Sequence, residues 1–196
     1  MVESLAGLVL PNGFTRWTAV RDVHAPAELI FSRILDMPEY PRMVNGFVAC
    51  DIYRRELSPP GTQRLYAKYK VRELGVTLEC FMQHEYDWRP AARGKCLSWS
   101  LDYSRSSDIS DTVGYWFVEP LADGWSRCYY SCDMSLPTWI PAVLRDTLLS
   151  VAAKRATSWL GPECQLAMRK RAMPWASPRL KLNSLLQSRW RHREQA

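Results

Sequence analysis

The segment VTLECFMQHEY, residues 76–86, alternates apolar and polar side chains with a period of two residues. The first face holds Val76, Leu78, Cys80, Met82, His84 and Tyr86. The other face is polar except for Phe81. Because successive side chains of a β-strand point to opposite faces, the alternation predicts a half-buried antiparallel strand with one face on a core.

The flanking sequence repeats this pattern. Further strands are expected at residues 64–71 (RLYAKYKV), 95–104 (KCLSWSLDYS), 111–121 (DTVGYWFVEPL) and 127–136 (RCYYSCDMSL). Turn residues separate them at 59–61, 73–75, 92–94 and 123–124. With one strand directly after Gly46, we expect six strands in series from about Phe47 to Leu136.

Helical periodicity appears on both sides of this series. A strand predicted at residues 14–25 leads into a helix that begins near Pro26 and must end before Pro38, since a residue preceding proline resists the helical conformation. A long helix is expected from Trp139 to about Leu160, with Gly161-Pro162 ending or kinking it. Its apolar stripe comprises Ile140, Val143, Leu144, Thr147, Leu148, Val151 and Ala152. Strands followed by a segregated helix indicate an α+β fold.

The length of 196 residues suits one domain. We expect a loose lead-in at 1–13, a folded domain at 14–166 and a tail at 167–196. The six cysteines form no CxxC pair and no zinc-type cluster, which favours reduced, mostly buried thiols. No apolar run reaches the roughly 20 residues of a membrane-spanning helix.

The net charge of +6 is concentrated in the tail. Residues 167–196 hold eight Lys or Arg against one Glu, so residues 1–166 are nearly neutral. The tail also has an apolar stripe among its basic residues, which favours contact with an anionic membrane surface or a partner complex. A solvated, disordered tail is the alternative, and the absence of a basic face on the body disfavours nucleic acid. The contact candidates are Arg179, Lys181, Leu182, Leu185, Leu186, Arg189, Trp190 and Arg191.

Catalytic motifs are missing from the sequence. It holds no GxGxxG, GxxxxGK[ST], HExxH or GxSxG pattern. His84 lies on the apolar face of its strand, which favours a satisfied core histidine over a catalytic one. We therefore predict no catalytic residue, no metal site and no fixed cofactor.

Residues 21–44, RDVHAPAELIFSRILDMPEYPRMV, resemble the opening of the START-like, polyketide cyclase/dehydrase and lipid-transport (SRPBCC) superfamily. The closest similarity is to its coenzyme Q-binding family, whose pattern A/SPxELxxxxxDxExYPxFxP is matched by Ala25, Pro26, Glu28, Leu29, Asp36, Tyr40 and Pro41. The spacing to a later W-x-F strand, Trp116–Val118, and to the closing helix also fits. The resemblance covers about residues 14–160.

This resemblance implies a helix-grip fold. In it, a seven-stranded antiparallel sheet wraps around a long C-terminal helix, two short helices follow the first strand, and a hydrophobic cavity lies between sheet and helix. Members of the superfamily mostly bind lipids, quinones, sterols or pigments, and a minority catalyse cyclisation or aromatisation. Plastid and mitochondrial members exist.

The inward faces of the predicted strands and helix supply the candidate ligand site. It comprises Tyr40, Met43, Val44, Phe47, Tyr69, Leu78, Met82, His84, Trp99, Leu101, Tyr103, Val143, Leu144 and Leu148. The first four are gate candidates, and Tyr69, His84 and Tyr103 are expected to hydrogen-bond a polar head group. A dry core filled by these side chains is the alternative.

Three functions follow as hypotheses. The first is non-enzymatic binding or chaperoning of a quinone, lipid or pigment, peripheral to an organellar membrane, either a chloroplast thylakoid or the mitochondrial inner membrane. The second is an accessory subunit or assembly factor of a photosynthetic or respiratory membrane complex, anchored by the tail. The third is a cyclase-like enzyme that uses His84 or a tyrosine as acid or base.

Overall fold

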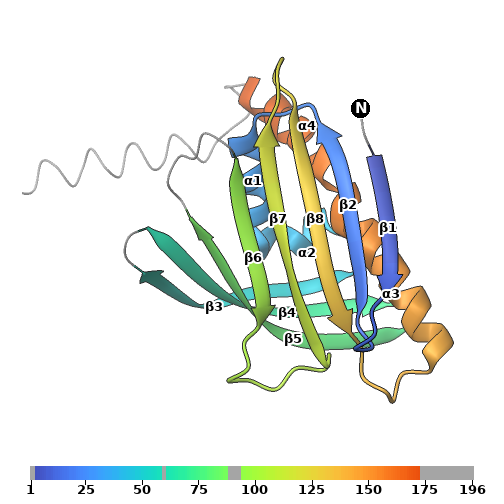
Figure 1. Cartoon of the computed structure of the whole chain (residues 1–196). Helices are drawn as coiled ribbons and strands as arrows, with labels where there is room; N and C mark the ends of the chain where they lie inside the picture. Colours follow the sequence, from blue (N-terminus) through green and yellow to red (C-terminus); the bar gives the residue numbers. More distant parts are fainter. Residues whose placement is uncertain (1–2, 59–60, 88–93, 173–196) are drawn as a thin grey trace, which may run out of the picture.

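The computed structural model describes residues 3–58, 61–87 and 94–172. Within them, eight strands form one antiparallel sheet in the order β1-β2-β8-β7-β6-β5-β4-β3. The strands are β1 (Glu3–Val9), β2 (Thr15–Val23), β3 (Phe47–Ser58), β4 (Thr62–Glu73), β5 (Val76–Asp87), β6 (Lys95–Leu101), β7 (Asp111–Pro120) and β8 (Ser126–Ser135). Figure 1 shows β3, β4 and β5 running crosswise to β6, β7, β8 and β2, so the sheet bends sharply. The α+β helix-grip architecture is confirmed.

The strand at the N-terminus differs from the expected loose lead-in. Residues 3–9 pair with β2 along their whole length, from Glu3↔Arg21 to Val9↔Thr15, which raises the strand number from seven to eight. Every side chain of β1 is exposed, so no alternation of apolar and polar residues marks it in the sequence. The pairing favours glycine at position 7, because a Cβ there would lie 2.7 Å from the Trp17 ring.

The central series of six strands matches the prediction. The apolar face of β5 is turned inward, with Leu78, Cys80, Met82, His84 and Tyr86 all buried. The exception, Phe81, lies on the outer face, where Arg105 stacks on it at 5.1 Å. The period-two pattern therefore assigned both faces of this strand correctly.

Three short helical segments follow β2, namely α1 (Ala27–Leu35), η1 (Met37–Glu39) and α2 (Tyr40–Met43). Pro26 is the residue directly before α1, and α1 ends three residues before Pro38. Pro41 lies in the first turn of α2, where its missing N–H has no helical partner. The two prolines thus divide this stretch into one-turn pieces rather than a plain loop.

The long C-terminal helix ends close to the expected position near Leu160, and a second helix that was not predicted follows it. α3 (Ala142–Ser158) ends at Trp159, and α4 (Leu160–Ala172) follows at once, with Gly161 and Pro162 in its first turn. We expected this pair to end or kink the long helix. Because a proline at the start of a helix loses no hydrogen bond, it begins α4 instead. α4 also runs past residue 166, the predicted end of the domain.

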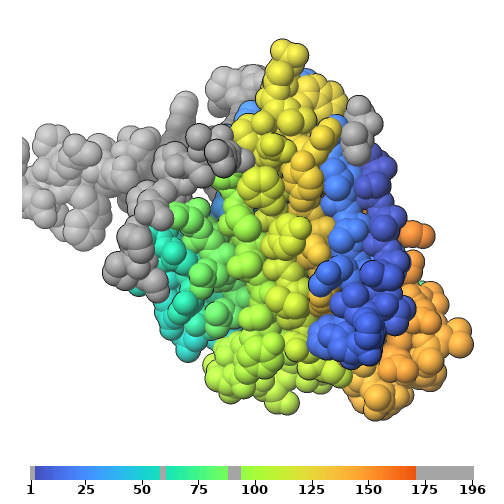
Figure 2. All heavy atoms as spheres, viewed as in Figure 1, coloured from blue at the N-terminus to red at the C-terminus, as the bar shows by residue number. Residues whose placement is uncertain are grey.

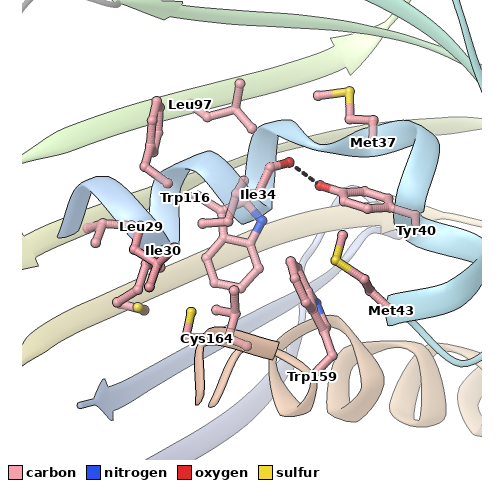
Figure 3. Packing of buried hydrophobic residues seen from close by; sticks show 14 of the residues in the cluster. Leu29, Ile30, Ile34, Met37, Tyr40, Met43, Leu97, Trp116, Trp159 and Cys164 are labelled. Atoms are coloured by element: carbon pink, nitrogen blue, oxygen red, sulfur yellow. Dashed lines mark hydrogen bonds between the residues drawn. The ribbon is translucent and has the colours of Figure 1, made fainter. Parts of the chain in front are cut away.

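The main core lies between α1, α4 and the strands β6 and β7. Ile30 and Ile34 of α1 meet Leu97, Trp116 and Cys164 there, as Figure 3 shows. All five are at most 6% exposed. A second cluster surrounds the first half of α3. Five of the six cysteines are buried and all six are free, and only Cys96 is exposed.

Candidate functional site

A cavity of about 240 Å³ lies between the inner face of the sheet and α3. Strands β3 to β8, the segment after α2 and the second half of α3 all contribute to its wall. The outer face of the sheet, drawn in Figure 2, is a continuous surface over β6, β7, β8 and β2.

Nine of the fourteen predicted ligand-binding residues line this cavity. They are Tyr40, Val44, Phe47, Tyr69, Leu78, Met82, His84, Trp99 and Leu148. The strand members face it because inward positions of neighbouring antiparallel strands coincide, as in the pairs Tyr69↔Cys80 and His84↔Trp99. The structure thus brings together most of the predicted site, and a role in binding stays a prediction.

Tyr69 and His84 form a polar contact on the cavity wall. The Tyr69 hydroxyl lies 2.9 Å from Nε2 of His84, and the tautomer of the imidazole decides which of them donates. Burial lowers the pKa of His84 to about 4, and the Leu65 backbone opposes this shift. Burial also raises the pKa of Tyr69 well above its usual value. Both groups are therefore uncharged at neutral pH, and together they offer a donor or an acceptor.

The mouth of the cavity is polar and more exposed. Asn45, Arg72 and Ala152 are exposed lining residues, so the cavity opens between the segment after α2, the end of β4 and α3. An ion pair between Arg155 of α3 and Glu73 of β4 crosses this opening. The charges of the site are thus at its mouth, and the uncharged hydrogen-bonding pair is inside.

Solved structures with this architecture exist at low sequence identity. A START superfamily protein from Mycobacterium smegmatis is 16% identical with a TM-score of 0.62, covering 79% of this chain and 99% of its own. The human StAR-related lipid transfer protein 5 is 10% identical with a TM-score of 0.66, covering 85% of this chain and 83% of its own. The chain has the START-like fold.

Within the START-like fold the similar proteins differ in activity. The Zhui aromatase/cyclase from Streptomyces sp. R1128 is 15% identical with a TM-score of 0.60, covering 80% of this chain and 95% of its own. No protein-family model matches this sequence, and no curated protein does. The closer resemblance to the coenzyme Q-binding family therefore stays a prediction.

Five predicted ligand-binding residues lie off the cavity wall of this START-like fold. Met43 and Leu101 are buried in the two core clusters, and Leu144 packs against the second cluster. Tyr103 is 71% exposed, because β6 ends at Leu101 and the alternation stops there. Val143 is 81% exposed, because the inner face of α3 is rotated from the predicted stripe toward Leu149, Ala156 and Trp159. The inward placement expected for Tyr103 and Val143 is wrong.

The prediction also missed wall residues from β7, β8 and α3. Trp116 and Tyr130 face each other across these strands, with ring centroids 4.7 Å apart, and both line the cavity. The alternation in residues 111–121 could have placed Trp116 inward, since it shares a face with Thr112 and Val118. Arg155 is not a member of the predicted apolar stripe, and its position at the cavity involves an ion pair with Glu73, which no local pattern reveals.

Tyr40, a gate candidate, forms part of a fixed wall. Its hydroxyl donates to the Ile34 carbonyl at 2.5 Å, and its ring packs against Phe47, Tyr69 and Trp159 with centroids 5.2 to 6.1 Å apart. Burial raises its pKa. Tyr40 is thus held by a buried hydrogen bond and by three rings, among them the ring of Trp159, which is labelled beside it in Figure 3.

Other expected features lie partly or wholly outside the described residues. The predicted membrane or partner contacts lie wholly outside them. These are Arg179, Lys181, Leu182, Leu185, Leu186, Arg189, Trp190 and Arg191. In the part of the chain that the structure describes, no helix combines the length and apolar character needed to cross a membrane. No group of three or more potential metal ligands occurs among those residues either.

Proposed function

We propose that this protein binds a hydrophobic small molecule in the cavity between its sheet and α3. The observation that carries this proposal is the cavity wall, which is largely apolar and aromatic and includes the uncharged hydrogen-bonding pair of Tyr69 and His84. Ligand sites in proteins have this composition, with few polar groups that fix orientation. The lipid-transfer and START proteins of similar fold support the proposal.

The cavity volume limits the size of the ligand. About 240 Å³ is somewhat below the roughly 300–1,000 Å³ of typical ligand pockets. Aromatic faces dominate the wall, with Phe47, Trp99, Trp116, Tyr130 and Trp159 among them. Such faces favour offset or edge contacts with a flat ring system. A quinone-like or pigment-like ring, or the end of a lipid, with one carbonyl or hydroxyl for Tyr69 and His84 fits these features.

Binding without catalysis is favoured by the state of the polar pair. A general acid or base works best with a pKa near the operating pH. Burial moves the pKa of His84 down to about 4 and that of Tyr69 upward, so both shifts reduce proton transfer at neutral pH. A cyclase-like enzyme is the second candidate function, because the same pair touches the cavity and an aromatase/cyclase has a similar fold.

Native mass spectrometry of the purified protein tests the binding proposal. A bound molecule of stoichiometric mass that leaves under denaturing conditions is the expected result. Ala156→Trp, which places an indole at the half-buried cavity side of α3, should remove it. Lys154→Trp adds the same ring on the exposed side of α3 and should retain it. An empty wild-type protein that also binds no added aromatic probe would overturn the proposal.

We also propose the cellular setting expected from the sequence, a peripheral position at an organellar membrane. What supports it is the basic, apolar-striped sequence of residues 173–196. An accessory role in a membrane complex would use the same segment. Deleting residues 173–196 and measuring association with anionic vesicles and with isolated membranes tests both. Association with the vesicles that is lost on deletion supports the membrane, and association with native membranes alone supports a complex.

A further inference from the structure

Charge at the cavity is confined to one side. Among the described residues that line it, only Arg72, Glu73 and Arg155 carry a charge at neutral pH, and all three lie at the mouth. They leave one excess positive charge there. A purely apolar ligand would need no charged group at this position. The charged residues at the mouth therefore bear on which class of ligand the cavity binds.

The backbone at Gly46 packs closely against the ion pair at the mouth. Gly46 has a φ of +98° and lies directly against the pair. A Cβ there would lie 3.3 Å from the Glu73 carboxylate and 3.4 Å from the Arg155 guanidinium. The carbonyl of Gly46 accepts a hydrogen bond of 2.7 Å from the backbone N–H of Arg72. Loop, strand and helix thus leave room at the cavity mouth for two charged groups side by side.

The pair is also easy to exchange. The Arg155 side chain is 37% exposed and that of Glu73 is 18% exposed. Ion pairs in contact with water contribute little net stability, because water competes for both partners. A second carboxylate or a sulfonate can therefore replace Glu73 on Arg155 at small cost. Arginine suits this exchange because its planar guanidinium binds such groups with two parallel hydrogen bonds.

The geometry points to an amphiphilic ligand whose acidic group Arg155 binds at the mouth in exchange for Glu73, with Arg72 adding attraction. The apolar or aromatic body of the ligand lies inside, against the aromatic wall. This inference rests on the proposed function and specifies its ligand class. Glu73 then keeps Arg155 paired while the cavity is empty and lowers the affinity for the acid.

Two fluorescent probes with the same aromatic body test the inference. 8-Anilinonaphthalene-1-sulfonate carries one anionic group, and N-phenyl-1-naphthylamine lacks it. Fluorescence titration of the full chain should give at least fivefold tighter binding of the sulfonate. Raising the salt concentration should weaken binding of the sulfonate and leave binding of the amine nearly unchanged, because only the sulfonate forms a charge pair that salt screens. Ala156→Trp should reduce the binding of both probes.

Variants of residues at the mouth test whether Arg155 causes the preference for the sulfonate. Arg155→Gln should weaken binding of the sulfonate at least fivefold more than binding of the amine. Arg155→Lys should restore part of this difference between the two affinities. Glu73→Gln, which removes the competing carboxylate, should strengthen binding of the sulfonate about threefold, because an ion pair that water reaches contributes little net free energy. Lys154→Gln, one residue away and outside the cavity, should change neither probe. Circular dichroism confirms that each variant is folded.

The outcomes separate the two proposals. Tight binding of the amine with no preference for the sulfonate, or equal losses for both probes in Arg155→Gln, overturns the acidic ligand and leaves hydrophobic binding in place. Failure of both probes to bind the folded wild-type protein overturns the proposed function together with this inference. A sulfonate preference that disappears in Arg155→Gln and returns in Arg155→Lys supports both.

Discussion

The inner face of one sheet is filled at one end and hollow at the other. Beneath α1 and α4, large side chains such as Ile30, Ile34 and Met37 meet without exposure to solvent. Beneath the second half of α3, the helix presents Ala152 and Ala156, and about 240 Å³ stays open. The same fold thus builds a core or a cavity according to the size of the side chains that its helices present.

This difference carries a cost in stability. Unfilled space of this kind forgoes packing and transfer free energy, on the order of 24 cal/mol per Å³ in cavity-creating mutants. Protein interiors otherwise approach the density of organic crystals. The contrast between the hollow end and the well-filled end can be tested by mutation.

Truncations on the two sides should have unequal effects on stability, the largest expected here. Ile34→Ala empties a site with no exposure and should lower the free energy of unfolding by about 2–5 kcal/mol. Leu148→Ala enlarges a space that already exists and should cost about half as much. Urea unfolding followed by circular dichroism measures both. Equal losses would show that the α3 side is packed as tightly as the α1 side.

Acid should destabilise the hollow side through His84. The pKa of this histidine is lowered to about 4 in the folded protein, against about 6.5 in an unfolded chain. The unfolded state therefore takes up the proton first as the pH falls. The stability that neutral His84 contributes is complete above pH 6.5 and is lost between about pH 6.5 and about pH 4, by roughly 3 kcal/mol.

The control for this pH dependence is His84→Phe, which retains a ring and removes the titration. Urea unfolding between pH 7.5 and pH 4.5 should lose stability steeply in the wild type and only weakly in the variant. Parallel curves for the two proteins would show that His84 is already charged or solvated in the folded state, contrary to the burial described above.

Trp99 lies between the filled and hollow ends and packs against both clusters. It rests on Gly114 of β7, where a Cβ would come within 2.3 Å of the Trp99 ring and 2.4 Å of the Ser131 carbonyl. Gly114→Ala should therefore shift the ring or the strand and cost about 1–3 kcal/mol. Thermal unfolding measures the loss. Gly161→Ala, with open space around it, is the matched control and should cost little.

Local patterns predicted the strands and missed features that depend on distant partners. The alternation in residues 76–86 assigned both faces of β5, because a period of two is set by the backbone itself. β1 was missed because all of its side chains are exposed, so apolar and polar residues do not alternate along it. Tyr103 was misplaced because the pattern continued by one step after the strand had ended at Leu101.

The cavity wall shows the same limit. His84 and Tyr69 were predicted because each lies on an alternating strand, and their contact followed once β4 and β5 paired in register. The rotation of α3 could not be read from its sequence, since apolar residues occur on more than one side of that helix. Arg155 became a mouth residue only because Glu73, 82 positions earlier, lies opposite it.

The smallest expected effect concerns the hydroxyl of Tyr69 in the hollow end. Tyr69→Phe keeps the ring and removes one hydrogen-bonding group, worth about 0.5–1.5 kcal/mol. Binding of 2,3-dimethyl-1,4-naphthoquinone should therefore weaken roughly 2- to 10-fold, while 2,3-dimethylnaphthalene, which has no carbonyl, should change less than the quinone. Tyr103→Phe removes a hydroxyl that binds Asp111 outside the cavity and should leave both affinities unchanged. If Tyr69→Phe weakens both compounds equally, the hydroxyl supports the wall through His84 and does not contact the ligand.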